Sequence, residues 1–363
     1  MSILVVNAGS SSLKLRVLDD RDRIVAEADI DRWDGDDVGA IAELVERDGA
    51  IDAVGHRVVH GGTRFASPVL LDDDTRTALR ALAPLAPLHQ SRSLAGIAAT
   101  DRLLPGIPAV ACFDTAFHAT LSPAAATYAV PLEWRLLGVR RYGFHGLSHA
   151  WGARRAAELL GRSPGDLRLV IAHLGAGASL CAVTGGRSVD TTMGFTPLEG
   201  LVMATRPGSV DPGVLLWLER EHGIGVGELE DGLQHRSGLL ALSGRSGDLR
   251  DILAAIVAGD GDAQLAYAVY LHRLRASIAA MTATLGGLDA LVFTGGVGQH
   301  LPQVRVDACQ GLGYLGVALD PAASATDGDA HLSAAAASVA VLMVTAREDL
   351  QIAAEVRAVL GTR

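Results

Sequence analysis

The chain has 363 residues, of which 49% are hydrophobic and 4% aromatic, and its formal net charge is −10. This length favours two domains with cores built from Ala, Val, Leu and Ile. Because the charge is negative and no stretch is basic, a nucleic-acid partner is excluded, and any anion must be bound by locally placed cations.

The N-terminus begins directly with a strand pattern, so we expect no signal peptide. The longest uncharged apolar stretches, around 276–288 and 333–346, are too short and too rich in small residues to span a bilayer. The three cysteines are widely spaced, which favours core positions over disulfides or zinc. We therefore expect a cytoplasmic protein with no membrane partner.

The first predicted elements enclose a Gly/Ser turn next to the only lysine. Of the 31 basic residues, Lys14 alone is not an arginine. The apolar run 3–6 predicts a buried strand, and alternation over 13–17 predicts a second one. Between them, residues 7–12 offer N–H and hydroxyl donors to an anion. An ordinary hairpin with a surface lysine is the alternative, but a compact ammonium suits a phosphate in a loop better than a planar guanidinium does.

The same pattern recurs in the second half of the chain. The strand 167–172 leads through the turn 173–179 into the strand 180–183, and then to 188–192. The first copy likewise continues to a third strand at 24–28. Two such meanders predict an internal duplication.

Apolar residues with helical spacing lie between these strands. They predict helices at 75–82, 91–103, 149–160, 263–285 and 347–360. A further strand, 288–293, ends in a Gly-rich turn at 294–298. Each half therefore predicts a layered α/β domain, with the seam near 146–151.

Four more clusters place charged or imidazole side chains beside glycine near the ends of apolar runs. They are residues 55–62, 112–118, 140–149 and 194–208. Strand ends and the following loops are where α/β proteins hold ligands. The four clusters together, beside three Gly-rich turns, favour a ligand site.

Each cluster also has a structural interpretation. His56, His60 and His149 fit hydrogen-bonding core residues, residues 140–141 fit a solvated or ion-paired face, and Asp114 fits a helix cap.

Taken together, these motifs resemble those of the acetate, propionate and butyrate kinase family, and of its acetate kinases in particular. The matching blocks are 5–14, 54–62, 113–118, 142–146, 192–200 and 243–250. The resemblance implies an α/β fold of two duplicated actin-like (ribonuclease H-like) ATPase domains with a cleft between them. We expect an N-terminal domain at 1–148 with the acyl-substrate residues and a C-terminal domain at 149–346 with the nucleotide site. We expect the helix within 347–363 to pack back on the first domain.

The resemblance also implies roles for particular residues. The implied catalytic residues are Asp114, Arg57, Arg206 and His145. Substrate binding is implied for Arg57, and a small acyl pocket for Val59, Leu88, Phe144 and Pro197. Nucleotide binding is implied for Lys14, Ser10, Ser12, His173, Gly175, Gly177, Asp248, Arg250, Gly296 and Gly298. Asn7 and Glu348 are the implied site for Mg²⁺ or Mn²⁺, ATP or ADP is the implied nucleotide, and a homodimer is the implied assembly.

The chain departs from the family pattern mainly on the nucleotide and metal side. Ala176, Gln299, His300 and Arg347 stand where the family has Asn, Glu, Asn and Asn, and Ser209 replaces Asp. Losing one hydrogen bond costs about 0.5–1.5 kcal/mol, or about 2- to 12-fold in affinity. The motifs on the acyl side are intact. The sequence therefore indicates the phosphoryl acceptor more firmly than the phosphoryl donor.

The leading hypothesis is reversible, ATP-dependent phosphorylation of acetate to acetyl phosphate. A carboxylate is already ionised at neutral pH, so Asp114 is expected to orient an arginine or a metal-bound water rather than act as a base. The alternatives are a propionate or butyrate kinase, a kinase for hydroxyl acceptors, and a non-catalytic sensor of nucleotide or acyl phosphate.

Overall fold

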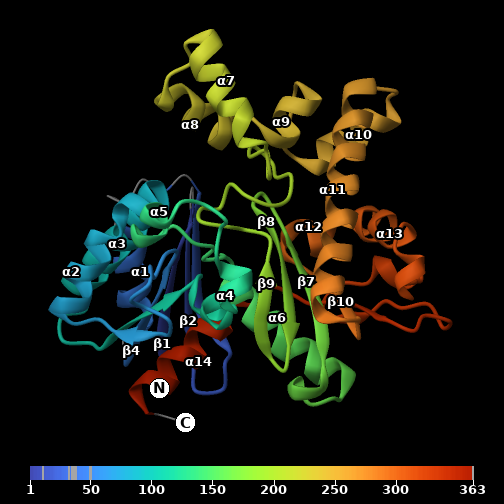
Figure 1. Cartoon of the computed structure of the whole chain (residues 1–363). Coiled ribbons are helices and arrows are strands. Elements are labelled where there is room, and N and C mark those ends of the chain that lie inside the picture. The colour runs from blue at the N-terminus through green and yellow to red at the C-terminus, as the bar shows by residue number, and fades with distance from the viewer. Residues whose placement is uncertain (10–11, 32, 34–38, 49–50, 362–363) are drawn as a thin grey trace. The chain divides into compact units, whose positions relative to one another are not determined.

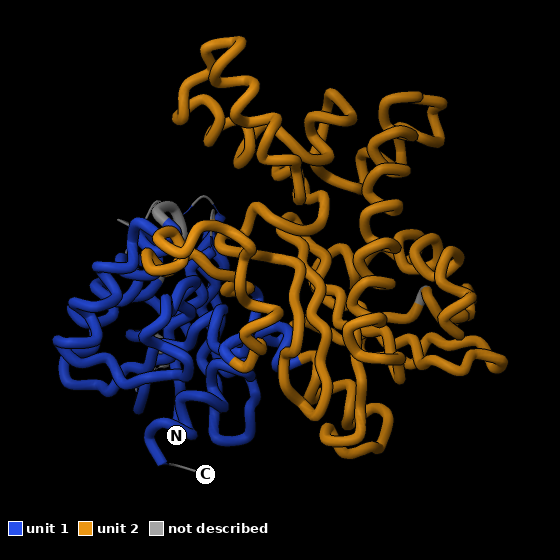
Figure 2. Tube along the Cα trace, viewed as in Figure 1, with its two compact units in different colours: residues 1–119, 144–151, 347–363 blue, residues 120–143, 152–346 orange. Residues whose placement is uncertain are grey.

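The computed structural model describes residues 1–9, 12–31, 33, 39–48 and 51–361. The chain forms two compact units (Figure 2). Unit 1 comprises 1–119, 144–151 and 347–363, and unit 2 comprises 120–143 and 152–346. The division therefore differs from a single boundary at 148. Segment 120–143 joins unit 2 because it is hydrogen-bonded there; for example, the Tyr142 N–H donates to the Gly194 carbonyl at 3.1 Å.

Unit 1 is built on a six-stranded sheet in the order β3-β2-β1-β4-β6-β5. The first three strands form an antiparallel meander, β4 and β6 run parallel to β1, and β5 is an antiparallel edge. The strands are β1 (Ile3–Ala8), β2 (Ser12–Leu18), β3 (Ile24–Asp31), β4 (Ala53–Val58), β5 (Val69–Leu70) and β6 (Ala109–Phe113).

Unit 2 repeats this topology strand for strand, in the order β9-β8-β7-β10-β12-β11. Again a meander comes first, two strands run parallel to its first strand, and a two-residue strand closes the edge. The strands are β7 (Arg168–Leu174), β8 (Ala178–Thr184), β9 (Arg187–Thr191), β10 (Ala290–Thr294), β11 (Ala330–His331) and β12 (Ala340–Met343). The duplication predicted from the two meanders is confirmed.

The helices lie mainly between the strands in sequence (Figure 1). In unit 1 they are α1 (Gly39–Asp48), α2 (Asp73–Ala81), α3 (Pro87–Leu103) and α14 (Glu348–Leu360). In unit 2 they are α4 (Pro123–Ala126), α5 (Leu132–Leu136), α7 (Pro212–His222), α8 (Val226–His235), α9 (Gly238–Ser243), α10 (Leu249–Val257), α11 (Gly261–Leu285), α12 (Gly295–His300) and α13 (Pro302–Gln310). Helix α6 (Gly146–Leu160) begins in unit 1 and continues into unit 2. Short 3₁₀ turns are η1 (Ala83–Leu85), η2 (Ala116–Thr120), η3 (Pro164–Asp166), η4 (Gly313–Leu315) and η5 (Ala323–Ala325).

Both faces of the central strand β1 are buried. Alternate residues of β1 enter two separate apolar clusters, as expected for a central strand covered on both faces. Helix α14 covers one face through Ile352 and Val356, although it is more than 200 residues distant in sequence from the strands it contacts. A Cβ at Gly55 on β4 would lie 2.5 Å from Ile352, so glycine permits this close approach. Among the described residues, no helix is both long and apolar enough to cross a membrane.

Candidate active site

Three of the predicted residues lie at the same edge of the unit 1 sheet. Asn7 is near the end of β1, Arg57 near the end of β4, and Asp114 directly after β6. These three strands are parallel neighbours, so their carboxyl ends meet at one edge. The sheet therefore brings together residues that lie far apart in sequence.

Arg57 and Asp114 form a forked ion pair at this edge. Arg57 Nε donates to Asp114 Oδ1 at 3.0 Å and Nη2 donates to Oδ2 at 2.6 Å, while Nη1 donates to Asn7 Oδ1 at 3.0 Å. Burial opposes the charge of Arg57, but the Asp114 and Glu348 carboxylates outweigh it and raise its pKa. Burial raises the pKa of Asp114, and the Arg57 guanidinium opposes that shift. A guanidinium has five N–H groups, and these contacts engage three of them.

Glu348, the first residue of α14, completes this cluster. Asn7 Nδ2 donates to Glu348 Oε2 at 2.9 Å, and Arg57 Nη1 lies 3.9 Å from the same oxygen. Carboxylate and amide oxygens are hard donors suited to Mg²⁺. No group of three or more His, Cys, Asp or Glu residues within the described ranges could hold a metal ion. A single carboxylate fits an ion that takes its other ligands from nucleotide phosphates and water.

The backbone of Asp114 holds a strained turn. Its carbonyl accepts from the Gly146 N–H at 2.8 Å, and a Cβ on Gly146 would lie 2.2 Å from that carbonyl oxygen. The preceding residue, His145, has φ 57°, a left-handed conformation that costs a non-glycine residue about 1–3 kcal/mol. The side chain of Asp114 therefore binds Arg57, while its backbone carbonyl binds the turn that contains His145.

The predicted acyl-pocket residues divide between the two units. In unit 1, Val59 and Phe144 are 2% and 1% exposed. Phe144 packs against His60 with ring centroids 5.5 Å apart, and its carbonyl accepts from His118 Nε2 at 3.0 Å. The Leu88 side chain lies outside the described part, and Pro197 belongs to unit 2.

Arg206, in unit 2, is held differently from Arg57. Its Nη1 donates to the Pro197 carbonyl at 2.9 Å. Burial lowers the pKa of Arg206, and no carboxylate in the described part of the chain forms an ion pair with it. The Arg206 guanidinium therefore remains available to an anionic ligand.

A pocket of about 390 Å³ in unit 2 brings together four of the predicted nucleotide residues, Gly175, Asp248, Arg250 and Gly296. Gly175 follows β7 and Gly296 follows β10, so the pocket lies at the carboxyl ends of two parallel strands. It is also lined by Ala176, Ala204, Gly247, Leu249, Val297 and His300, and by two residues that the sequence patterns did not indicate, Leu239 and Leu301. Its volume suits a small-molecule ligand.

The other predicted nucleotide residues lie elsewhere. His173 is on β7, Gly177 is in the following turn, and Gly298 is in α12, but none of them lines the pocket. Lys14 and Ser12 are on β2 in unit 1, where Lys14 is exposed and lies opposite Asn7 in register. Ser10 lies outside the described residues.

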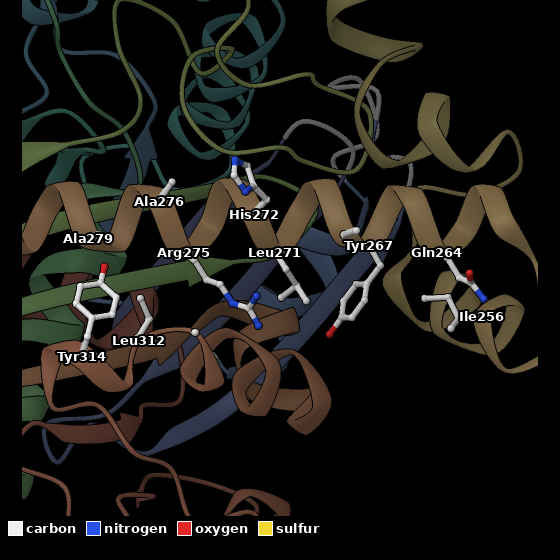
Figure 3. Close-up of a pocket in the computed structure, with 12 residues that line it drawn as sticks. Ile256, Gln264, Tyr267, Leu271, His272, Arg275, Ala276, Ala279, Leu312 and Tyr314 are labelled. Carbon is white, nitrogen blue, oxygen red and sulfur yellow. The ribbon is translucent and has the colours of Figure 1, made fainter.

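Helix α11 borders a separate, larger pocket of about 570 Å³ (Figure 3). The α11 side chains Tyr267, Leu271 and Arg275 line it together with Leu312 and Tyr314. It contains none of the residues that the motifs indicated.

Comparison with known proteins agrees with this geometry. The family model described as the acetokinase family matches residues 37–354. The chain belongs to the acetokinase family. The acetate kinase of Leifsonia xyli is 46% identical over 391 residues, covering 97% of both chains. That of Gloeobacter violaceus is 51% identical over 307 residues, covering 84% of this chain and 76% of the relative.

Solved structures of acetokinase-family proteins have the same fold. The Porphyromonas gingivalis acetate kinase superposes with a TM-score of 0.90 at 34% identity, over 99% of both chains. A propionate kinase from Francisella tularensis superposes with a TM-score of 0.91 at 32% identity, over 98% of this chain and 99% of the propionate kinase. A ROK hexokinase from Thermus thermophilus superposes with a TM-score of 0.50 at 13% identity, over 99% of both chains. This likeness relates the fold alone to actin-like sugar kinases.

Proposed function

We propose that this member of the acetokinase family is an acetate kinase, which transfers the γ-phosphoryl group of ATP reversibly to acetate and forms acetyl phosphate and ADP. The observation that carries the proposal is the Arg57–Asp114 pair, joined to Asn7 and Glu348 at the carboxyl ends of β1, β4 and β6. The relatives named acetate kinase, which span most of the chain, support it.

The reaction needs charge screening rather than a base. Acetate is ionised at neutral pH, so one of its oxygens can attack the γ-phosphorus directly. The new P–O bond forms as the bond to the β–γ bridging oxygen breaks, and ADP leaves with that electron pair. No proton is transferred, which agrees with an Asp114 carboxylate committed to Arg57. The barrier lies in bringing two anions together.

The residue roles follow from the available donors. We assign the two remaining N–H groups of Arg57, together with Arg206, to the acetate carboxylate and the transferring phosphoryl group. His145, placed by the turn that Asp114 holds, would stabilise that group. Val59, Leu88, Phe144 and Pro197 would enclose the methyl group.

The nucleotide would occupy the unit 2 pocket, with its phosphates reached by Lys14, Ser10 and Ser12. The other residues proposed to bind the nucleotide are His173, Gly175, Gly177, Asp248, Arg250, Gly296 and Gly298. Asn7 and Glu348 would hold Mg²⁺ or Mn²⁺, which when bound neutralises phosphate charge. Because ATP is the donor, we place the protein in the cytoplasm.

Hydroxylamine trapping of acetyl phosphate tests this function. We expect wild-type turnover with acetate and loss of about 100-fold or more for Arg57→Ala and Arg206→Ala. Arg76→Ala is the control, since Arg76 pairs with Asp101 on the surface of the same unit as Arg57. No product above background with acetate, propionate or butyrate would overturn the proposal.

A propionate kinase is the second candidate, because the Francisella propionate kinase superposes as well as the acetate kinases do. The buried, bulky Val59 and Phe144 favour the smaller acid. Comparing kcat/KM for the two acids decides between them.

We also propose a homodimer, in line with the family resemblance. Large apolar side chains are exposed in unit 2, among them Leu216, Trp217 and Val226 in the region of α7 and α8. Light scattering during size-exclusion chromatography tests the assembly, and a mass of one chain at micromolar concentration would contradict it.

A further inference from the structure

Glu199 is held from both sides by residues of a distant segment of the same unit. Arg141 Nη2 donates to Glu199 Oε1 at 2.7 Å, and the Tyr128 hydroxyl donates to Glu199 Oε2. The Arg141 guanidinium also lies over the Tyr128 ring, 5.5 Å from its centroid. These three side chains, the Tyr128–Arg141–Glu199 brace, occupy both oxygens of one carboxylate.

The brace fixes the loop that follows β9. Arg141 Nη1 lies 3.2, 3.1 and 3.0 Å from three successive carbonyls, those of residues 191–193. The Phe195 N–H donates to the Tyr128 hydroxyl oxygen at 3.0 Å. A Cβ on Gly194 would lie 2.1 Å from that oxygen, so the loop backbone passes directly against the brace. The brace thus holds the backbone at residues 191–193 and at Phe195.

The same loop contains Pro197, whose carbonyl binds the Arg206 guanidinium. Arg206 Nη1 donates to the Pro197 carbonyl at 2.9 Å, and no described carboxylate pairs with this arginine. Beyond Glu199, the loop is closed by Ser209, whose N–H donates to the Gly200 carbonyl at 3.0 Å and whose hydroxyl accepts from the Gly200 N–H at 3.2 Å. Because Pro197 lies between the brace and this closure, both fix the carbonyl that orients Arg206.

We propose that Tyr128, Arg141 and Glu199 are positioning residues for the phosphoryl-transfer site, and that they act through Pro197 on the Arg206 guanidinium. They do not touch the substrates. Arg57 takes its orientation from a carboxylate that binds it directly, whereas Arg206 takes its orientation from a braced loop. The kinetic prediction rests on the proposed acetate kinase function.

Tyr128→Phe and Glu199→Gln test the proposal by kinetics. Tyr128→Phe removes the hydroxyl that contacts Glu199 and Phe195, and Glu199→Gln removes the charge that pairs with Arg141, both with little change in shape. We expect kcat/KM for acetate to fall about 10-fold, as for the loss of a hydrogen bond to a charged group, with the KM for ATP within about twofold of wild type. Tyr267→Phe is the matched control, because the Tyr267 hydroxyl donates to Asp307 Oδ2 at 2.7 Å in the same unit. Unchanged acetate kinetics in both brace variants, or an equal loss in Tyr267→Phe, would overturn the proposal.

Amide hydrogen exchange of peptides covering 191–209 gives a readout that does not depend on turnover. We expect faster exchange there in both brace variants and not in Tyr267→Phe. If the wild type does not phosphorylate acetate but exchange still rises, the proposed function fails and the brace stands. If exchange in 191–209 is unchanged, the brace fails whatever the activity. Should Glu199→Gln not fold, Tyr128→Phe, which leaves the Arg141–Glu199 ion pair in place, carries both measurements.

Discussion

Arg57 and Asp114 are fixed to each other twice, through the sheet and through their side chains. The Asp114 N–H donates to the Val58 carbonyl at 3.0 Å and continues the β4–β6 ladder by one residue. Their side chains then meet in the forked ion pair, with Asp114 only 1% exposed. The orientation of the arginine is therefore set before any substrate binds.

Asp114→Asn should damage both catalysis and stability. The amide keeps one acceptor oxygen but loses the charge, and its NH₂ group faces the Arg57 donors. We expect acetate turnover to fall about 100-fold or more. Removing one partner of a buried ion pair should lower the free energy of unfolding by about 3–5 kcal/mol. Coupled-enzyme kinetics and urea unfolding measure the two effects.

Asp101→Asn is the matched control, because Asp101 accepts from Arg76 Nε and Nη2 at 2.9 and 2.7 Å near the surface of the same unit. This variant should keep wild-type acetate kinetics. An Asp114→Asn enzyme with wild-type kcat would refute the view that Asp114 orients Arg57 for catalysis.

Local patterns predicted the two meanders, β10 and the helices α2, α3, α6, α11 and α14, but not the helices α7 to α10. Alternation around Lys14 predicted β2, and the apolar run 288–293 predicted β10 (Ala290–Thr294) to within two residues. The segment after β10 was predicted as a turn, but it forms the short helix α12. Its glycines carry no helical spacing, and the buried Arg305 holds two of its carbonyls, so a tertiary contact stabilises what local sequence does not favour.

The candidate site residues came from contiguous motifs and from the family resemblance that those motifs carry, and their roles stay predictions. Asp114 was expected to cap a helix, or to orient an arginine or a metal-bound water, and in the structure its side chain binds Arg57. The residues at 140–141 were expected to be solvated or ion-paired, and Arg141 is paired with Glu199. Tyr128 gave no sequence signal, because a contact between residues 71 positions apart has no spacing to detect.

The acyl preference should depend on Val59. With Val59 and Phe144 both buried, an added methylene on the substrate would clash, at a cost of roughly 1–3 kcal/mol. We expect acetate to be preferred over propionate, and Val59→Ala to narrow the ratio of their kcat/KM values. Val58→Ala is the control: it removes the same atoms from the neighbouring core position and should alter stability but not the ratio. A wild type that prefers butyrate would refute the pocket assignment.

Acid should destabilise unit 1 through its buried histidines. Burial lowers the pKa values of His56, His60 and His118 to about 4. Since the unfolded values are near 6.5, the unfolded chain binds more protons below that pH, and stability falls as pH drops from 6.5 towards 4. Each such histidine lowers the free energy of unfolding by about 1.4 kcal/mol for every pH unit of acidification in this range.

Urea unfolding at pH 7 and pH 5 measures how steeply the free energy of unfolding changes with pH. His56→Gln should make this change shallower, whereas substitution of the exposed His331 by Gln should not. Equal stability of the wild type at both pH values would contradict the prediction.

The single lysine should matter for the nucleotide. Lys14 is exposed on β2 opposite Asn7, and Lys14→Arg keeps the charge but replaces a compact ammonium with a larger, planar guanidinium. We expect a lower kcat and a higher KM for ATP, with the KM for acetate much less affected. The variant would be a lysine-free chain that should fold. Arg16→Lys on the same strand is the reciprocal control, and wild-type kinetics for Lys14→Arg would show that the surviving lysine has no role.

Arg305 should act on the nucleotide side alone. This fully buried side chain donates from Nη1 to the Gly298 and Gln299 carbonyls, both at 2.7 Å, and from Nη2 to the Ser324 carbonyl. It thereby fixes the end of α12, whose residues Gly296 and His300 line the unit 2 pocket proposed for the nucleotide. Arg305→Lys keeps the charge, but one ammonium cannot reproduce the forked contact with these carbonyls.

We therefore expect Arg305→Lys to raise the KM for ATP about 10-fold while the KM for acetate stays within about twofold. Arg275→Lys is the control, because Arg275 also donates to a backbone carbonyl, that of Asp307, in the same unit. Initial rates with each substrate varied in turn, together with calorimetric titration of ATP, separate binding from turnover. If ATP affinity is unchanged, or if both KM values rise equally, Arg305 stabilises the unit without placing α12 for the nucleotide.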